Sequence, residues 1–404
     1  MTISESGIGS ELDSNQNRVS PQNLDEVVEV IAFANRGNKT LSIQGNATKT
    51  RYQPYVTKTD ITLSSSSLDK LISHNPSDMT ATIQSGVSIA QIQKSLYQFG
   101  QWLAIDPPMW DRGATLGGVV AAGHAGPSRV KFGSIKDLVI GMTAVLGDGR
   151  VIRCGGNVIK NVAGYDLSKI FCGSWGTLAF IVDVTLRLHP LAESKRILKA
   201  KLSWEQAQNF ALSLIASPFD PTAIEIGFDH IWIVLEGSSI GTSQRANAIA
   251  QMASNSNIEI QNVEISQAQA VFDKFSQIRI ATEEQSILKA SILPSQLAKA
   301  VEELDNLANK IAIDYQVVSH GGSGIVLAKL SSGDLHSHGE LVKKWRDYLQ
   351  GLGGTMIVEQ GQNGLQELVS YWGNPPGGFK VMQRIKEEFD PKTILTPGGF
   401  GGWW

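Results

Sequence analysis

Residues 113–127 read GATLGGVVAAGHAGP, a run in which small side chains surround a short apolar core. Glycine allows a ligand to approach the backbone and leaves N–H groups open to anionic oxygen atoms. A helix that begins near Thr115 would add the positive end of its dipole to that surface. Because a helix packed closely on a sheet also requires small residues, the run alone indicates either a cofactor surface or tight packing.

Three other segments in the same half of the chain combine glycine with polar residues. They are residues 45–49 (GNATK), Gly133-Ser134 with Asp137, and residues 173–177 (GSWGT). Each alone is typical of a turn, but together they exceed what one domain needs in order to fold. The sequence has no Walker A motif, no Gly-x-Gly-x-x-Gly at a strand-to-helix turn, no His-Glu-x-x-His and no Gly-x-Ser-x-Gly, which disfavours the usual nucleotide, zinc-protease and serine-hydrolase sites.

The composition of the whole chain limits the class of protein and the kinds of metal site that are possible. The chain has 404 residues, 42% hydrophobic and 18% charged, with a net charge of −3, which predicts a globular protein of two domains and gives no sign of nucleic-acid binding. Cys154 and Cys172 form no Cys-x-x-Cys pair, so the chain cannot supply an iron–sulfur cluster or a structural zinc site by itself. Residues 1–18 are predicted to form a disordered tail, and their polar, acidic composition does not resemble a signal peptide. No apolar run in the sequence is long enough to span a bilayer.

The first predicted domain, residues 19–192, mixes helices and strands without a regular βαβ alternation, which indicates an α+β fold. Periodicity and turn residues predict helices at residues 23–35, 89–99 and 116–122, and strands at residues 41–44, 80–84, 139–146, 150–153 and 177–188.

The second predicted domain, residues 193–380, repeats one order of elements, β-α-β-β-α-β, which is the ferredoxin-like pattern. The first copy is predicted at residues 197–202, 204–216, 223–228, 231–235, 243–254 and 258–263, and the second at residues 286–290, 294–311, 313–318, 324–329, 339–351 and 356–359. Such a duplication would build one sheet with helices on a single face, forming a cap over an active site. Residues 381–404 are rich in turns and are expected to return to the first domain.

The order of the glycine-containing motifs resembles that of FAD-binding domains of the vanillyl-alcohol-oxidase type, also called PCMH-type. The motifs lie at residues 45–49, 103–108, 115–126, 133–137, 160–167 and 173–181. Residues 101–108 (QWLAIDPP), 117–127 (GGVVAAGHAGP) and 160–168 (KNVAGYDLS) are similar in more detail to the E-type FAD-binding subunits of bacterial glycolate oxidases. The resemblance implies a PCMH-type domain of two α/β subdomains and a duplicated, ferredoxin-like α+β cap domain.

The same resemblance implies that the first domain binds FAD non-covalently. The pyrophosphate would be wrapped by Gly45, Asn46, Ala47, Thr48 and Lys49. The other side of the cofactor would be lined by Thr115, Gly117, Gly118, Ala122, Gly123 and Gly126. Gly133 and Asp137 would hold the neighbouring turn, and the backbone of Ile181 would meet the adenine or ribose end. Asn46 and Ala47 stand where the family usually has glycine, and His124 lacks the context of a covalent flavin link.

For the reaction, the resemblance implies hydride transfer from the alpha carbon of a 2-hydroxy acid, glycolate above all, to the flavin. No catalytic residue and no metal site is assigned, since His320 has no second histidine nearby and His336 and His338 are expected in a solvated loop. Two hypotheses stay open: a dehydrogenase for glycolate or D-lactate, and an accessory or electron-relaying FAD subunit without its own substrate site. A sugar or lactone oxidase of the same superfamily is a third interpretation.

In either of the first two hypotheses, electrons must leave through another chain. The resemblance therefore implies a second flavin subunit and an iron–sulfur subunit as partners. The protein is expected in the cytoplasm, held at the inner face of the membrane through these partners and not by a membrane segment of its own.

Overall fold

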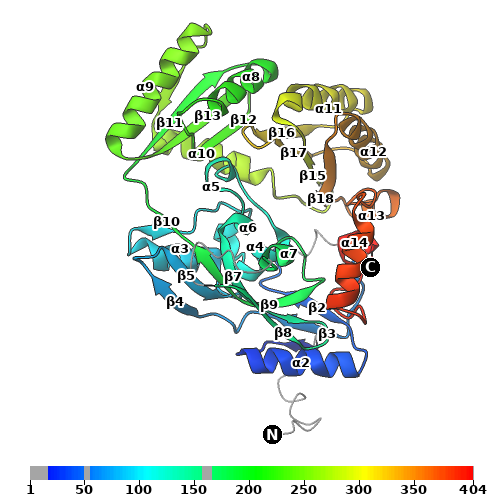
Figure 1. Cartoon of the computed structure of the whole chain (residues 1–404). Helices are drawn as coiled ribbons and strands as arrows, with labels where there is room; N and C mark the ends of the chain where they lie inside the picture. Colours follow the sequence, from blue (N-terminus) through cyan, green and yellow to red (C-terminus); the bar gives the residue numbers. More distant parts are fainter. Residues whose placement is uncertain (1–16, 50–54, 157–165, 404) are drawn as a thin grey trace. The chain divides into compact units, whose positions relative to one another are not determined.

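In a computed structural model of the chain, residues 17–49, 55–156 and 166–403 are described. They fold into two compact units (Figure 1). The first unit contains the described residues within Met1–Ala125, Ser134–Leu191 and Pro375–Trp404, and the second comprises Gly126–Gly133 and Ala192–Asn374. Within the described residues, no helix is both long and apolar enough to cross a membrane.

The first unit contains three sheets in its described part. A parallel sheet is formed, in spatial order, by β1 (Arg18–Val19), β3 (Ile61–Ser64) and β2 (Leu41–Gln44). An antiparallel sheet is formed by β4 (Leu71–Asn75), β5 (Thr80–Gln84), β9 (Ala179–Arg187), β7 (Val139–Leu146) and β8 (Val151–Gly155). A short antiparallel pair is formed by β6 (Gln101–Trp102) and β10 (His189–Pro190).

Some helices of the first unit begin at residues whose side chains cap them. They are α2 (Leu24–Arg36), α3 (Ile89–Tyr97), η2 (Trp110–Arg112), α4 (Leu116–Ala122), α6 (Ile135–Leu138), α7 (Ser168–Phe171), α14 (Phe379–Phe389) and α15 (Gly399–Gly402). Asn23 caps α2 by accepting a hydrogen bond from the amide of Glu26, and Ser88 with Gln91 forms a capping box on α3. Gly100 follows α3 with a φ of 67°, a conformation that glycine adopts without strain.

One hydrophobic core joins the parallel sheet to the antiparallel sheet. Side chains of α2, such as Ile31, pack with Leu41 of β2, Leu63 of β3 and Phe180 of β9. Leu395, from the end of the chain, belongs to the same core and is fully buried. The C-terminal segment is therefore part of the first unit's interior.

The second unit contains the predicted duplication. The first copy consists of β11 (Ser194–Lys201), α8 (Trp204–Ile215), β12 (Ala223–Gly227), β13 (His230–Gly237), α9 (Ser239–Asn255) and β14 (Gln261–Val263). The second copy consists of β15 (Ser286–Ser291), α11 (Leu297–Ile311), β16 (Tyr315–His320), β17 (Ile325–Leu330), α12 (Leu335–Gly351) and β18 (Thr355–Gln360). Among the described residues, these strands form one sheet in the order β14-β11-β13-β12-β16-β17-β15-β18, with the two copies joined edge to edge by β12 and β16.

The prediction that all helices lie on one face of this sheet is wrong for α10 (Ile265–Gln277), which connects the two copies. Phe275 of α10 packs with Trp232 and Leu327. Ile231 and Ile233 alternate with Trp232 along β13, so they point to the opposite face, where α8, α9, α11 and α12 lie (Figure 1). The face that carries Trp232 is therefore only partly covered by a helix, α10.

The unit boundaries also differ from the predicted ones at residues 126–133 and 375–380. The short helix α5 (Arg129–Phe132) groups with the second unit, where Val130 sits so close to Gly322 that a Cβ there would lie 2.5 Å from Val130 Cγ2. Residues 375–380 group with the first unit because they lead into α14, whose Lys386 is buried against it. Arg18, the last residue of the predicted tail, belongs to β1, and residues 1–16 lie outside the described residues.

Candidate functional site

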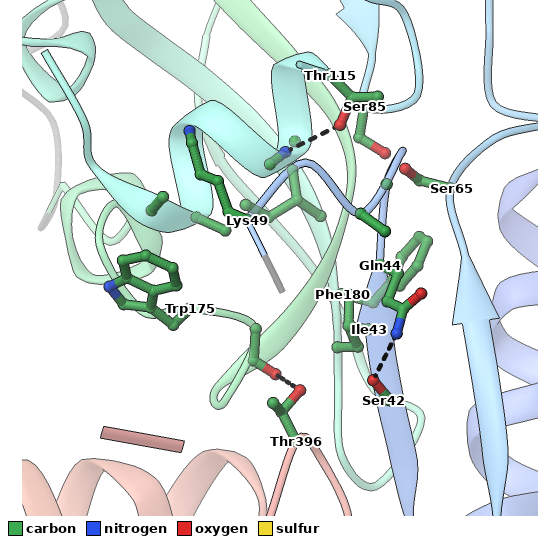
Figure 2. A pocket seen from close by; sticks show the side chains of 18 of the residues that line it. Ser42, Ile43, Gln44, Lys49, Ser65, Ser85, Thr115, Trp175, Phe180 and Thr396 are labelled. Carbon is green, nitrogen blue, oxygen red and sulfur yellow. Dashed lines mark hydrogen bonds between the residues drawn. The ribbon is translucent and has the colours of Figure 1, made fainter. Parts of the chain in front are cut away.

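A cavity of about 320 Å³ lies inside the first unit (Figure 2). This volume is at the small end of the range for small-molecule sites, about 300–1,000 Å³. Its lining mixes hydroxyls, amides and one ammonium group with apolar and aromatic side chains such as Ile43, Trp175 and Phe180. The chemistry suits a ligand that has both a flat ring system and anionic oxygen atoms.

The segment 45–49 forms one wall of the cavity, directly after β2. The side-chain amide of Asn46 donates a hydrogen bond to the carbonyl of Gly113 at 2.9 Å, which ties this wall to the residues before α4. A Cβ at Gly45 would lie 2.2 Å from Thr115 Oγ1, so only glycine permits the two walls to approach this closely. Ala47 has a φ of 54°, in the left-handed region that alanine adopts only with strain.

The start of α4 forms the facing wall, but its amides are used differently from the sequence expectation. The amide of Leu116 donates to the carbonyl of Val87, and that of Gly117 donates to the carbonyl of Ser85. The amide of Gly118 donates to Thr115 Oγ1 at 3.3 Å. Because the first turn is already bonded within the protein, it offers shape more than free donors. Gly118 keeps that shape open, since a Cβ there would meet only Thr115 Oγ1 within 4 Å.

The third wall joins two distant parts of the chain. The turn before β9 contributes Trp175 and Gly176, and the C-terminal segment contributes Thr396. Thr396 Oγ1 donates to the carbonyl of Gly176 at 3.1 Å. Trp175 and Thr396 have φ values of 55° and 44°, so these two non-glycine residues also hold left-handed conformations.

Ten of the fourteen residues that the sequence assigned to a cofactor line this one cavity. They are Gly45, Asn46, Ala47, Thr48, Lys49, Thr115, Gly117, Gly118, Ala122 and Ile181. The other four, Gly123, Gly126, Gly133 and Asp137, are not among its lining residues. The motif residues 160–165 lie outside the described residues.

Each of those four residues has a place outside the lining. Gly123 ends α4 with a φ of 63° and packs against Gly173, whose Cα would lie 3.2 Å from a Cβ at position 123. Gly126 and Gly133 bound the segment that groups with the second unit. Asp137 closes a capping box by accepting hydrogen bonds from the amide and the hydroxyl of Ser134, at 2.8 and 2.7 Å.

Several lining residues were not selected from the sequence. They are Ser42, Ile43, Gln44, Val56, Ser65, Ser85, Ala121, Trp175, Gly176, Ala179, Phe180 and Thr396. Trp175 and Gly176 fall within a turn that the glycine pattern had marked, and the turn-rich C-terminal segment carries Thr396. No local signal distinguishes Ser65 or Ser85 from an ordinary serine. His124 is buried and meets the Trp175 ring edge to face, with centroids 5.4 Å apart.

The second unit carries ionisable side chains on the sheet face that α10 only partly covers. His320 Nδ1 lies 2.9 Å from Glu225 Oε2, and both side chains are more than nine-tenths buried. Nε2 of His320 is buried and has no hydrogen-bond partner in the described part of the chain. This pairing leaves one ring nitrogen oriented by a carboxylate and the other available.

Lys289 lies on the same face, 3.7 Å from the fully buried carboxylate of Glu359. Burial lowers the pKa of the Lys289 ammonium, and the charge of Glu359 opposes that shift. The positive charges of Arg279 and Arg129 lower the pKa further. Cationic groups therefore outnumber the carboxylate here, which favours an anionic ligand.

His336 and His338 lie at the start of α12 rather than in a loop, and of the two only His336 is exposed. His338 is completely buried rather than solvated, with Nδ1 2.9 Å from Ser286 Oγ and Nε2 2.8 Å from the carbonyl of Ser332. Burial lowers its pKa, although the Ser332 carbonyl and the Asp334 charge oppose the shift. In the described ranges, no group of three or more His, Cys, Asp or Glu side chains could hold a metal ion.

Comparison with known proteins gives two family matches. Residues 16–155 match the protein family described as FAD binding domain. Residues 194–399 match the family described as FAD linked oxidases, C-terminal domain.

Three relatives have names that indicate chemistry. D-lactate dehydrogenase of Archaeoglobus fulgidus is 28% identical over 94% of this chain and 90% of that protein. Glycolate oxidase subunit GlcD of Bacillus subtilis is 24% identical over 94% of this chain and 87% of that protein. Glycolate oxidase subunit GlcE of Escherichia coli is 33% identical, but over only 41% of this chain and 48% of that protein.

A solved structure of alkyldihydroxyacetonephosphate synthase superposes with a TM-score of 0.73 at 18% identity, covering 94% of this chain and 76% of that one. At this identity the likeness concerns the fold alone.

Proposed function

The chain belongs to the FAD-linked oxidases, and from that premise we propose that it is the FAD-binding subunit of an oxidoreductase for small 2-hydroxy acids such as glycolate. The observation that carries the substrate class is the cationic group around Lys289 in the second unit, which suits a carboxylate. The names of the relatives, D-lactate dehydrogenase and glycolate oxidase subunits, support the same class.

The cavity of the first unit fits FAD. Glycine at positions 45 and 118 leaves room where a side chain would enter the opposite wall or the cavity. The amides of Gly45, Asn46 and Thr48 donate no hydrogen bond within the described residues, so they are available to phosphate oxygens. Trp175, Phe180 and Ile181 supply apolar contact area.

Within this proposal, the residues of the second unit have two roles. Lys289 and Arg279 bind the carboxylate of the hydroxy acid by charge-assisted hydrogen bonds. His320, oriented by Glu225, accepts the hydroxyl proton at Nε2. FAD, when bound, supplies the hydride acceptor for the alpha carbon.

Electrons then leave through a second flavin subunit and an iron–sulfur subunit at the inner face of the membrane. Only two cysteines occur in the chain, and both are free thiols, so a cluster must come from another protein. Burial raises the pKa of Cys154 to about 11 and that of Cys172 to about 12, which keeps both thiols protonated and unsuited to metal binding.

Anaerobic addition of glycolate or D-lactate to the FAD-loaded chain tests this proposal, because a substrate should bleach the flavin absorbance. Lys289→Met should raise the substrate KM about tenfold or more, as expected for loss of one charged hydrogen bond. Lys329→Met is the matched control, since Lys329 lies on the adjacent strand β17 without an acidic partner, and it should change KM less than about twofold. Equal effects of the two variants would refute the role of Lys289.

An accessory, electron-relaying FAD subunit is the second candidate function. The single histidine at position 320, which has no second histidine close by in the sequence, favours it. Stoichiometric FAD that glycolate and D-lactate leave oxidised, but that a reduced partner subunit bleaches, would select this candidate. Unchanged bleaching in His320→Gln would show that His320 does not take the proton.

A further inference from the structure

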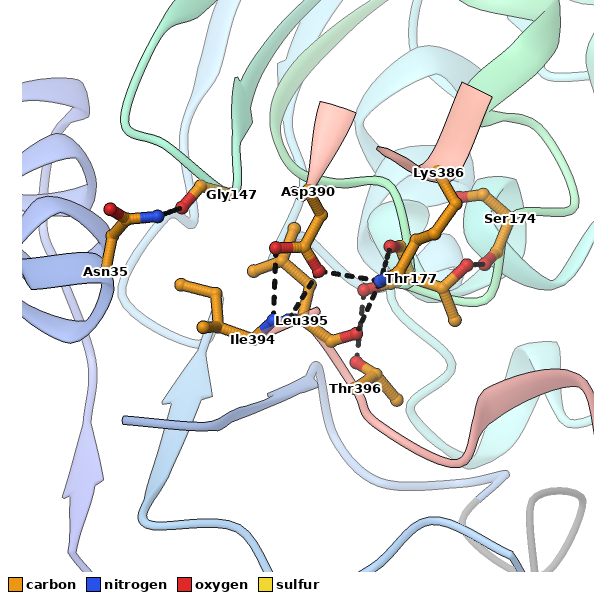
Figure 3. Close-up of polar contacts among 10 residues, drawn as sticks. Asn35, Gly147, Ser174, Thr177, Lys386, Asp390, Ile394, Leu395 and Thr396 are labelled. Atoms are coloured by element: carbon orange, nitrogen blue, oxygen red, sulfur yellow. Dashed lines mark hydrogen bonds and ion pairs between the residues drawn. The ribbon is translucent and has the colours of Figure 1, made fainter. Parts of the chain in front are cut away.

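A buried ion pair links the C-terminal segment to the wall of the cavity (Figure 3). Lys386 of α14 is 3% exposed and Asp390 is fully buried, with Lys386 Nζ 2.6 Å from Asp390 Oδ2. Burial lowers the pKa of Lys386, and the Asp390 carboxylate opposes that shift. Such a pair adds little stability over a well-packed apolar pair, so its presence calls for a more specific role.

The hydrogen bonds of this pair are complete and all lead to backbone. Lys386 Nζ donates to the carbonyls of Thr177 and Leu395, at 2.7 and 3.3 Å, besides its bond to Asp390. Asp390 accepts from the amide of Ile394 at 3.1 Å and from that of Leu395 at 2.8 Å. The pair therefore joins α14, the turn before β9 and residues 394–395.

Both of those segments continue directly into the cavity wall. Gly176 precedes Thr177, Thr396 follows Leu395, and both line the cavity. Thr396 Oγ1 donates to the carbonyl of Gly176, and the amide of Thr396 donates to the carbonyl of Leu41 at 2.7 Å. Leu41 in turn begins the strand that leads to the segment 45–49.

Thr396 holds an unfavourable conformation at this point. Its φ of 44° lies in the left-handed region, where a β-branched residue is a genuine outlier. Such residues persist only where the surrounding structure fixes them, and they gather at functional sites. The bonds of Asp390 to the two preceding amides supply that fixation.

We propose that Lys386 and Asp390 are positioning residues for FAD binding: they hold Thr396 against Gly176 and so form the third wall of the cofactor cavity. The pair acts through the backbone and does not itself line the cavity. The inference rests on FAD binding by the first unit and is independent of the substrate.

The experiment compares Lys386→Met with the loss of a half-buried cation elsewhere that is also bonded to backbone carbonyls. Arg245 of α9 donates to four backbone carbonyls, those of Gly241, Phe219, Asp220 and Glu236, but it belongs to the second unit. Both variants should lower the melting temperature. Only Lys386→Met should raise the Kd for FAD, by about 10- to 100-fold, the factor for one lost hydrogen bond to a charged group.

Limited proteolysis provides a second measurement that does not depend on activity. In Lys386→Met, cleavage within residues 390–400 should be faster than in the parent without FAD, and saturating FAD should suppress it, because binding restores the docked segment. An FAD Kd within about twofold of the parent would overturn the proposal, and so would an equal rise in Arg245→Met.

A smaller substitution keeps the proposal testable if Lys386→Met does not fold. Thr396→Val leaves the ion pair intact and removes only the hydroxyl that donates to Gly176, so the Kd for FAD should rise about three- to tenfold. Thr396→Ser retains the hydroxyl and should restore the parent affinity. Parent affinity in the valine variant would contradict the role of this contact.

Discussion

Replacing Gly118 with leucine should weaken FAD binding while the first unit stays folded. A Cβ at this position would lie 3.1 Å from Thr115 Oγ1 and otherwise faces open space in the cavity. The remaining leucine atoms must then occupy volume that FAD requires. Forcing extra methylenes into an occupied site costs about 1–3 kcal/mol. At about 1.4 kcal/mol per tenfold change, the Kd for FAD should rise roughly 5- to 150-fold.

The stability of the protein without FAD should change in the opposite direction. Gly118 lies inside α4, where glycine is less favourable than a good helix former by about 1 kcal/mol. Leucine removes that cost, and Thr115 Oγ1 is the one atom within 4 Å of its Cβ that would have to shift slightly. The same variant is therefore expected to have an unchanged or higher melting temperature without FAD, and a smaller rise on adding FAD.

Flavin fluorescence titration gives the Kd, and circular dichroism gives the melting temperature with and without FAD. Gly351→Leu is the matched control, because Gly351 ends α12 and a Cβ there would meet nothing within 4 Å. It should gain helix stability without affecting FAD. Gly118→Ala should fall between the parent and the leucine variant. Stoichiometric FAD in Gly118→Leu at parent affinity would refute the placement of this helix wall.

Two further predictions concern strain and protonation. Ala47→Gly should raise the free energy of unfolding, measured by urea titration, by up to about 1 kcal/mol, because glycine adopts the left-handed φ of 54° without strain. Ala250→Gly, inside α9, is the control and should lower the free energy of unfolding by about 1 kcal/mol. A lower free energy of unfolding in both variants would contradict the strain at Ala47. Burial lowers the pKa of His338 from 6.5, so the unfolded chain binds more protons than the folded chain below about pH 6.5. The free energy of unfolding should therefore fall as the pH drops below about 6.5, and His338→Gln should flatten this slope. A slope that is unchanged in His338→Gln would exclude this cause.

The sequence predicts the structure best where the local pattern of residues determines the helix or strand that forms. Residues 116–122 were predicted as a helix that starts near Thr115, and the structure has a helix with these bounds, capped by Thr115 and ended by Gly123 in the left-handed conformation. The duplicated unit was predicted because its two copies repeat one order of strands and helices, β-α-β-β-α-β. The helix α10 was missed because it falls between the two copies, where the repeat gives no guidance.

Long-range contacts account for what the sequence could not predict about the cavity. Leu41 and Leu395 form an isolated parallel bridge, which brings the end of the chain beside β2. Nothing in the local pattern of either segment specifies that partner. The role of Thr396 as a lining residue can therefore be recognised only once the fold is known. The same is true of the buried hydrogen bond from Lys386 to the carbonyl of Thr177.

The hydrogen bonds at α4 also change where FAD affinity should arise. The glycine-rich run suggested that the helix start donates to phosphate, yet the amides of residues 116–118 are bonded within the protein. The amides of Gly45, Asn46 and Thr48 have no such partners in the described part of the chain. We therefore expect phosphate binding to depend mainly on the amides of segment 45–49, and α4 and Thr396 to set the distance of that segment from the other walls. Substitutions in that segment should alter affinity through donors, and those in α4 through space.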